Sequence, residues 1–220
     1  MYVKYCNGKN YINKLLAIRP GNTTMQPCGI ILLAAGKSAR MGQAKQLLLY
    51  KGKSLVRHSV EAALQASVGP VLLVTGANAT AIGQEGWDAQ LLVVENTIWM
   101  EGIASSIRCG LAALLTACPT ITQTIFMVCD QPFVTPQLLN QLVLARGHTG
   151  KPIIACAYAG TVGTPMLFGA EFFPQLMLLQ GDEGAKKLVR QYPSQLSTIA
   201  FELGAFDIDT PDDFTWLSNL

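Results

Sequence analysis

The sequence has little charge, few histidines and no long apolar run, and each shortage excludes a class of protein. Charged residues make up 14% of the chain, and its Lys and Arg residues form no dense cluster, so a nucleic-acid partner is not expected. The longest apolar runs, such as residues 30–35, fall far short of the roughly 20 residues that cross a bilayer. A membrane span is therefore not expected. The two histidines, His58 and His148, lie in helical contexts, and neither is assigned a catalytic role.

The cysteines and the N-terminal segment indicate where the protein is found. The six cysteines include no CxxC pair, which is typical of reduced thiols in a cytoplasm. Residues 1–27 carry scattered basic residues and lack the apolar segment of a secretory signal. We therefore expect a cytoplasmic protein with an N-terminal extension over residues 1–27. Half of the residues are apolar, so residues 28–220 are expected to form one domain around one substantial core.

The apolar pattern predicts an α/β protein. From residue 29 onward, short runs rich in Val, Ile and Leu alternate with longer segments of helical period, which is typical of a parallel sheet covered on both faces. The predicted strands are residues 29–33, 71–75, 90–95, 124–129, 152–157, 164–168 and 198–202. The predicted helices are residues 54–66, 103–117, 136–146, 184–192 and 211–218.

The loop after the first predicted strand combines small residues with cations. In an open parallel sheet, ligands bind beyond the carboxyl ends of the strands, where small residues let backbone N–H groups approach phosphate oxygens. Arg40 and Lys45 can neutralise a triphosphate there. A lone Gly36 would fit an ordinary turn, but its conjunction with the other residues favours a nucleotide site. The predicted nucleotide-binding residues of this loop are Leu33, Ala34, Ala35, Gly36, Ser38, Arg40, Met41, Gly42 and Lys45.

Three aspartates are candidates for holding Mg²⁺, which prefers carboxylate and phosphate oxygens. Asp130 follows the predicted strand 124–129 and should stand at the same edge of the sheet as the loop. Asp207 and Asp209 follow the last predicted strand, and we favour Asp207 as the second ligand. The alternatives are a turn-forming role for Asp130 and a helix-capping context for Asp209. With Lys45 and Arg40, Asp130 completes the predicted catalytic set.

Further motifs resemble a known family. The segment from Leu33 to Lys45 is similar to the loop motif of the molybdenum-cofactor nucleotidyltransferases, in the MobA-like NTP-transferase superfamily. Further motifs of that family recur in order along the chain. They include Gly76-Ala77-Asn78, Asn96-x-x-Trp99-x-x-Gly102-x-x-Ser105-Ser106, Cys129-Asp130-Gln131-Pro132, Gly181-Asp182 and Asp207-Ile208-Asp209.

The resemblance implies a fold, a reaction and a cofactor. It implies a three-layer α/β/α sandwich with a Rossmann-like, mostly parallel sheet of the nucleotide-diphospho-sugar transferase type. It also implies Mg²⁺-dependent transfer of a nucleoside monophosphate to the terminal phosphate of molybdopterin, with release of pyrophosphate. Members of the family with Ala at the position of Ala35 resemble cytidylyltransferases, whereas those with Gly resemble guanylyltransferases, so CTP is expected. The resemblance also suggests a molybdenum hydroxylase as the client.

Other functions stay open from the sequence alone. A GTP-using molybdopterin guanylyltransferase or a sugar-phosphate nucleotidyltransferase would use the same loop and Asp130. A non-catalytic carrier or maturation chaperone for the molybdenum cofactor could keep the fold and only deliver the finished cofactor.

The remaining motifs have both a binding and a structural interpretation. Gly76 and Asn78 follow the second predicted strand, where they could read a base or ribose or simply form a turn. Trp99 could stack on a pterin ring, although Trp in such a context more often packs. The hydroxyls near the start of helix 103–117 could bind an anion or cap the helix. The predicted acceptor-binding residues are Trp99, Gly102, Ser105, Ser106, Gly181 and Asp182.

Overall fold

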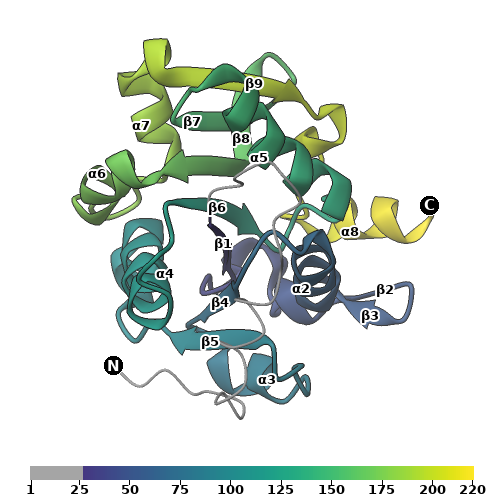
Figure 1. Ribbon diagram of the computed structural model, residues 1–220. Coiled ribbons are helices and arrows are strands. Elements are labelled where there is room, and N and C mark those ends of the chain that lie inside the picture. The colour runs from purple at the N-terminus through teal and green to yellow at the C-terminus, as the bar shows by residue number, and fades with distance from the viewer. Residues whose placement is uncertain (1–26) are drawn as a thin grey trace.

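The computed structural model describes residues 27–220, and its main sheet has seven strands in the order β5-β4-β1-β6-β8-β7-β9 (Figure 1). The predictions for residues 1–26 lie outside the described part of the chain. The strands are β1 (Cys28–Leu33), β4 (Val71–Thr75), β5 (Leu91–Glu95), β6 (Gln123–Val128), β7 (Ile153–Tyr158), β8 (Thr161–Gly169) and β9 (Leu196–Ala200).

The sheet is mostly parallel, as the sequence predicts. Strand β1 pairs in parallel with β4 and with β6, and β4 pairs in parallel with β5. Only β8 runs antiparallel to its neighbours β6 and β7. The carboxyl ends of β1, β4, β5 and β6 therefore meet at one edge of the sheet, which is where ligands bind in open sheets of this kind.

Helices cover both faces of the sheet and complete three layers (Figure 1). One face is covered by α4 (Ile103–Ala117), α6 (Phe173–Met177) and α7 (Lys186–Gln191), and the other by α2 (Leu55–Ala66), α3 (Ala79–Gly83) and α5 (Pro136–Thr149). Successive residues of β1 alternate between the two cores: Ile31 packs on the α4 side and Ile30 on the α2 side. Because both faces are buried, the strand is apolar at every position.

Smaller elements surround the loop that follows β1. The hairpin β2 (Leu49–Tyr50) and β3 (Lys53–Ser54) leads into α2. Helix α8 (Pro211–Ser218) packs beside the start of α2 through a small cluster of Leu55, Ile208 and Leu217. Within residues 27–220, no helix has the length and apolar character needed to cross a bilayer. The described residues also contain six short 3₁₀ segments: η1 (Ala39–Met41), η2 (Lys45–Leu47), η3 (Trp99–Glu101), η4 (Ala170–Phe172), η5 (Pro193–Gln195) and η6 (Glu202–Ala205).

Candidate functional site

The loop after β1 follows a tightly turned path at the carboxyl edge of the sheet. Its first residue, Ala34, still donates a backbone hydrogen bond of 2.9 Å to Val74 O of β4. Ser38 then adopts a left-handed conformation with φ 58°, and Gly42 does the same with φ 67°. Glycine takes that conformation without steric cost. The two turns fold the chain back, so that η2 and Lys45 lie beside the end of the strand.

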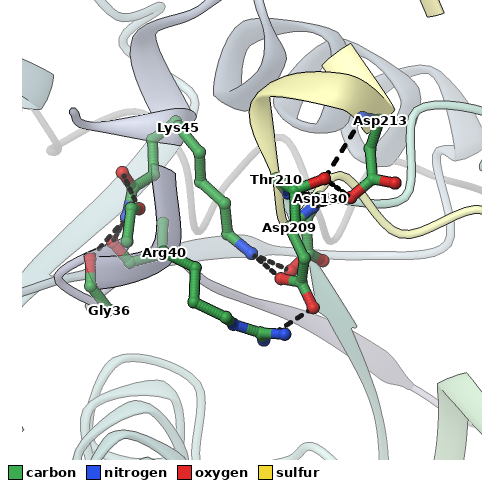
Figure 2. Close-up of polar contacts among 10 residues, drawn as sticks. Gly36, Arg40, Lys45, Asp130, Asp209, Thr210 and Asp213 are labelled. Carbon is green, nitrogen blue, oxygen red and sulfur yellow. Dashed lines mark hydrogen bonds and ion pairs between the residues drawn. The ribbon is translucent and has the colours of Figure 1, made fainter. Parts of the chain in front are cut away.

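Lys45 lies between two carboxylates (Figure 2). Its Nζ is 2.6 Å from Asp130 Oδ2 and 2.8 Å from Asp209 Oδ1. Arg40 reaches the same group from the loop, with Nη2 at 2.7 Å from Asp209 Oδ2. Lys45 and Asp130 therefore share one site, although 85 positions separate them in the sequence. The site combines two cations and two anions at the edge of the sheet.

The environment favours the charged forms of Lys45 and Asp209. Burial alone would lower the pKa of Lys45, but the Asp130 and Asp209 carboxylates outweigh burial and the pKa is raised. Burial alone would raise the pKa of Asp209, but its hydrogen bonds and ion pairs to Lys45 and Arg40 lower it. Asp207 differs, because desolvation and then the nearby Asp130 carboxylate raise its pKa to about 6.

Asp130 and Asp209 have the geometry to hold a divalent cation together. Oxygens of both carboxylates contact one Lys45 ammonium, so a cation at that point would also contact both. The other oxygen of Asp130, Oδ1, is buried and accepts no hydrogen bond from the described residues. A buried carboxylate oxygen without a partner suits a metal ligand. The residues from 27 to 220 contain no group of three or more His, Cys, Asp or Glu side chains that could hold a metal. Substrate phosphates would have to complete the coordination, as is usual for Mg²⁺.

This geometry favours Asp209 over Asp207 as the partner of Asp130. The sequence-based preference was for Asp207, yet Asp209 is the aspartate that shares Lys45 with Asp130. The start of α8 fixes the position of Asp209. The carboxylate of Asp213 accepts hydrogen bonds from Asp209 N at 3.0 Å and from Thr210 N at 2.7 Å, as part of a capping box (Figure 2).

A cleft of about 380 Å³ opens beside this group of charges. It brings together residues of the loop, of β6 and of the segments predicted to bind the acceptor. Its lining includes Leu33, Ala34, Ala35, Gly36, Lys37, Lys45, Trp99, Met100, Gly102, Ile103, Ser106, Cys129, Asp130 and Asp182. A Cβ added at Gly36 would meet no atom within 4 Å, so the space beside this glycine in the cleft is open. Burial raises the pKa of the Cys129 thiol to about 12, which makes it a poor nucleophile.

Gly76 brings three segments into contact behind the cleft. A Cβ at Gly76 would meet Ala35 Cβ at 2.8 Å and Trp99 Cβ at 2.9 Å, so only glycine allows this approach. Ala77 N donates a hydrogen bond of 3.1 Å to Ala35 O. Asn78 is turned toward the loop, and its Nδ2 lies 3.4 Å from Gln46 Oε1. In this structure Asn78 therefore supports the loop.

The predicted acceptor segments also touch each other. Gly102, with φ 119°, lies so close to Gly181 that an added Cβ would be 2.3 Å from the Gly181 carbonyl oxygen. The hydroxyls of Ser105 and Ser106 both accept hydrogen bonds from Asn96 Nδ2, at 2.8 and 3.0 Å. Ser105 also donates to Gly102 O and does not line the cleft, whereas Ser106 lines it. Of the two, Ser106 is the one placed to contact a ligand.

Gln46 is a site residue that sequence reasoning missed. Its side chain is 1% exposed and bonds to the backbone of the loop that precedes it. The available signal was an uncharged amide directly after Lys45 and before the apolar run Leu47-Leu48-Leu49.

The fold and the site together define a class of enzyme. A parallel sheet edge that carries a loop of small residues, two cations and two carboxylates that could hold a metal is suited to stabilise the charge that builds up when a nucleotide is transferred. The class is that of the nucleotidyltransferases.

The comparisons with known proteins identify the family within that class. The chain belongs to the family of the MobA-like NTP transferase domain, whose model matches residues 30–196. It is 30% identical over 201 residues to nicotine blue oxidoreductase of Paenarthrobacter nicotinovorans, an alignment that covers 86% of this chain and 96% of that protein. It is 26% identical over 206 residues to molybdenum cofactor cytidylyltransferase of Escherichia coli, with 86% of this chain and 95% of that protein covered.

Solved structures agree with this assignment. The crystal structure of Rv0371c from Mycobacterium tuberculosis superimposes with a TM-score of 0.77 at 31% identity and covers 90% of this chain and 100% of that one. A complex of Rv0371c with manganese gives a TM-score of 0.72 at 29% identity, with the same coverage. A similar protein therefore binds a divalent cation.

Proposed function

We propose that this nucleotidyltransferase transfers CMP from CTP to the terminal phosphate of molybdopterin, with Mg²⁺ as the metal and pyrophosphate as the second product. The observation that carries the proposal is that Lys45 forms ion pairs with both Asp130 and Asp209 beside the glycine-containing loop. Asp130 and Asp209 would hold Mg²⁺, which would supply positive charge beside the phosphates. Lys45 and Arg40 neutralise the triphosphate and the departing pyrophosphate.

The chemistry requires no general base. A phosphate monoester is already largely ionised at pH 7, so the acceptor oxygen needs positioning more than deprotonation. This agrees with the residues of the cleft, where the lining includes no histidine. The buried Cys129 thiol is not suited to form a covalent intermediate.

The choice of CTP rests on Ala35. This residue lines the cleft, and its methyl group lies beside Gly76. A methyl group at this point narrows the space for a base, and a methylene-sized difference is typically worth about 1–3 kcal/mol of discrimination.

The choice of molybdopterin rests on the relative from Escherichia coli and on the cleft. Sequence identity alone does not select the activity, since the relative named an oxidoreductase is 30% identical and the cytidylyltransferase 26% identical. The charges at Lys45, Asp130 and Asp209 favour nucleotidyl transfer, because they match a metal-bound triphosphate. The apolar residues Trp99, Met100 and Ile103 beside them suit a flat, ring-containing acceptor.

The test is pyrophosphate release from CTP and Mg²⁺ with molybdopterin as acceptor, measured beside reactions with GTP and with sugar 1-phosphates. We expect release with CTP and molybdopterin. Release with only a sugar phosphate would overturn the proposed acceptor, and binding without release would identify a carrier.

Variants of the charged group test the mechanism. Asp130→Ala and Lys45→Ala should each lower turnover by about 10²–10³-fold, because each removes a group that stabilises charge in the transition state. Lys53→Ala is the matched control, since Lys53 pairs with Glu61 on the β2–β3 side, at 2.6 Å. Circular dichroism checks that the variants fold. Turnover near that of the wild type in either Asp130→Ala or Lys45→Ala would contradict the assignment.

A further inference from the structure

The Gln46 side chain makes four hydrogen bonds around the loop that precedes it. Its Nε2 donates to Gly36 O at 2.7 Å and to Ala34 O at 3.2 Å. Its Oε1 accepts from Ser38 Oγ at 3.2 Å and from Asn78 Nδ2 at 3.4 Å. The two donors on the Oε1 side fix the orientation of the amide, so that the NH₂ group must face the two carbonyls.

Holding those carbonyls determines where the neighbouring N–H groups point. In a trans peptide, the C=O of one residue and the N–H of the next point in opposite directions. The carbonyls of Ala34 and Gly36 point toward Gln46, so the N–H groups of Ala35 and Lys37 point away from it. Within residues 27–220, the backbone N–H groups of Ala35, Gly36 and Lys37 donate to no other group of the chain. Backbone N–H groups left free in this way form a site for anions.

The hydrogen bonds of Gln46 also affect the position of Lys45. Gln46 and Lys45 are adjacent in η2, so the bonds that hold Gln46 also hold the backbone of Lys45. The loop, Gln46 and Lys45 therefore form one unit beside the cleft, and Gly36 leaves the space next to them open.

We propose that Gln46 is a positioning residue for nucleotidyl transfer, which holds the carbonyls of Ala34 and Gly36 back so that the N–H groups of the loop face the triphosphate. Gln46 acts on the phosphates through these N–H groups and through Lys45. The inference rests on use of a nucleoside triphosphate by this family and is independent of which base or acceptor is used.

Few side chains can replace glutamine in this role. A carboxylate has the same shape but places an oxygen against the two carbonyl oxygens, which repel it. Methionine has a similar length and fits an irregular buried space, but it donates nothing and leaves both carbonyls without their partner.

The first experiment compares Gln46→Met with Gln123→Met. Gln123 is buried to a similar degree, at 2% exposure, and lies at the start of β6, at the opposite edge of the sheet from the loop. Isothermal titration with inorganic tripolyphosphate and Mg²⁺ measures anion binding without a base or an acceptor. Loss of the hydrogen bonds that hold the Ala34 and Gly36 carbonyls should weaken binding about tenfold or more in Gln46→Met, with no loss in Gln123→Met. Unchanged binding in Gln46→Met, or an equal loss in Gln123→Met, overturns the proposal.

Steady-state kinetics separates positioning from general destabilisation. Gln46→Met and Gln46→Glu should raise KM for the nucleoside triphosphate and lower kcat, while KM for the acceptor stays within about twofold, because the hydrogen bonds of Gln46 go to the loop and to Asn78 and not to the acceptor segments. Equal changes in both KM values contradict the proposal.

A measurement on the wild type covers the case in which the variants do not fold. Tripolyphosphate should shift the amide proton resonances of Ala35, Gly36 and Lys37 downfield, because these N–H groups gain charged acceptors. Resonances that stay in place while tripolyphosphate binds overturn the proposal. If CTP transfer to molybdopterin fails but these shifts occur, the proposed function falls and the role of Gln46 stands.

Discussion

At the scale of single residues, the Lys45 ammonium lies where a divalent cation would also lie. One carboxylate oxygen of Asp130 and one of Asp209 contact the ammonium, at 2.6 and 2.8 Å. Mg²⁺ would need those same oxygens, so the lysine and the metal compete when no nucleotide is present. A triphosphate offers Lys45 other partners and also supplies oxygens for the metal. Metal and nucleotide should therefore bind with positive cooperativity.

Replacing Lys45 tests this competition. Lys45→Met should bind Mn²⁺ about tenfold more tightly than the wild type when nucleotide is absent, because both carboxylates become available to the metal. Electron paramagnetic resonance of free Mn²⁺ measures the affinity directly. Lys53→Met serves as the control, because it also removes one ion-paired lysine. Equal Mn²⁺ affinity in Lys45→Met and the wild type would show that the ammonium does not occupy the metal position.

Ala35 is the residue where the choice of base can be tested. Ala35→Gly removes the methyl group that lies beside Gly76 and so widens the cleft. The ratio of CTP to GTP affinity should fall about tenfold, since the change is that of one methyl group in a binding pocket. Titration of both nucleotides in Mg²⁺ gives this ratio. Ala155→Gly is the control, because Ala155 is also a buried alanine but lies in β7 and does not line the cleft. An unchanged ratio in Ala35→Gly would remove the physical basis for choosing CTP.

At the scale of elements, the sequence predicts long periodic segments well, but it predicts the terminal residues of helices and strands less well. The predicted helix 103–117 coincides with α4, because its apolar positions recur with helical period and face one core. Helix α5 extends beyond the predicted end at residue 146 to Thr149 and ends where Gly150 takes φ 65°. The glycine at position 147 suggested an earlier end, but it lies within the helix.

The elements that the sequence did not predict are short or depend on tertiary contacts. Helices α3 and α6 have five residues each, too few to show a period. The prediction for β9 began at residue 198, two residues late, because its exposed positions weaken the apolar pattern. The hydrogen bonds of Gln46 depend on carbonyls and side chains that folding brings together, and secondary-structure propensities do not predict such contacts.

The N-cap of α8 connects helix stability to the proposed metal site. Thr210 caps α8 and belongs to the capping box that also holds Asp209 N. Thr135 caps α5 in the same way and accepts a hydrogen bond from Leu138 N at 3.2 Å, but it has no contact with the site. Thr210→Ala and Thr135→Ala should each lower the free energy of unfolding by about 1 kcal/mol.

Only Thr210→Ala should also weaken metal binding, because the Asp213 carboxylate, which holds Asp209 N, then loses its hydrogen bond of 2.8 Å from Thr210 Oγ1. Chemical denaturation measures the stability of both variants, and Mn²⁺ titration in the presence of nucleotide measures the site. Equal metal affinity in the two variants would show that the cap supports the helix without positioning Asp209.

At the scale of the whole molecule, the site is assembled from segments far apart in the chain. Lys45 and Asp209 contact each other although 164 positions separate them. The family model ends at residue 196, so Asp209 comes from the segment beyond it. That segment is tied to the sheet by a hydrogen bond of 2.9 Å from Ile208 N to Asp130 O. Sequence could place each group after a strand, but only the folded sheet shows which of Asp207 and Asp209 meets Lys45.

Because the site exists only when these segments are folded together, its ligands should bind the native state and not the unfolded chain. At about 100 times the dissociation constant, such a ligand stabilises the native state by about 2.7 kcal/mol. For a domain of this size, that corresponds to a rise in Tm of about 5–10 °C. CTP with Mg²⁺ should give this rise in differential scanning fluorimetry, and EDTA should remove most of it. Asp130→Ala should show a much smaller rise at the same concentrations, since it lacks one of the two proposed metal ligands. A Tm that CTP and Mg²⁺ leave unchanged at millimolar concentrations would mean that the distant segments do not form one nucleotide site.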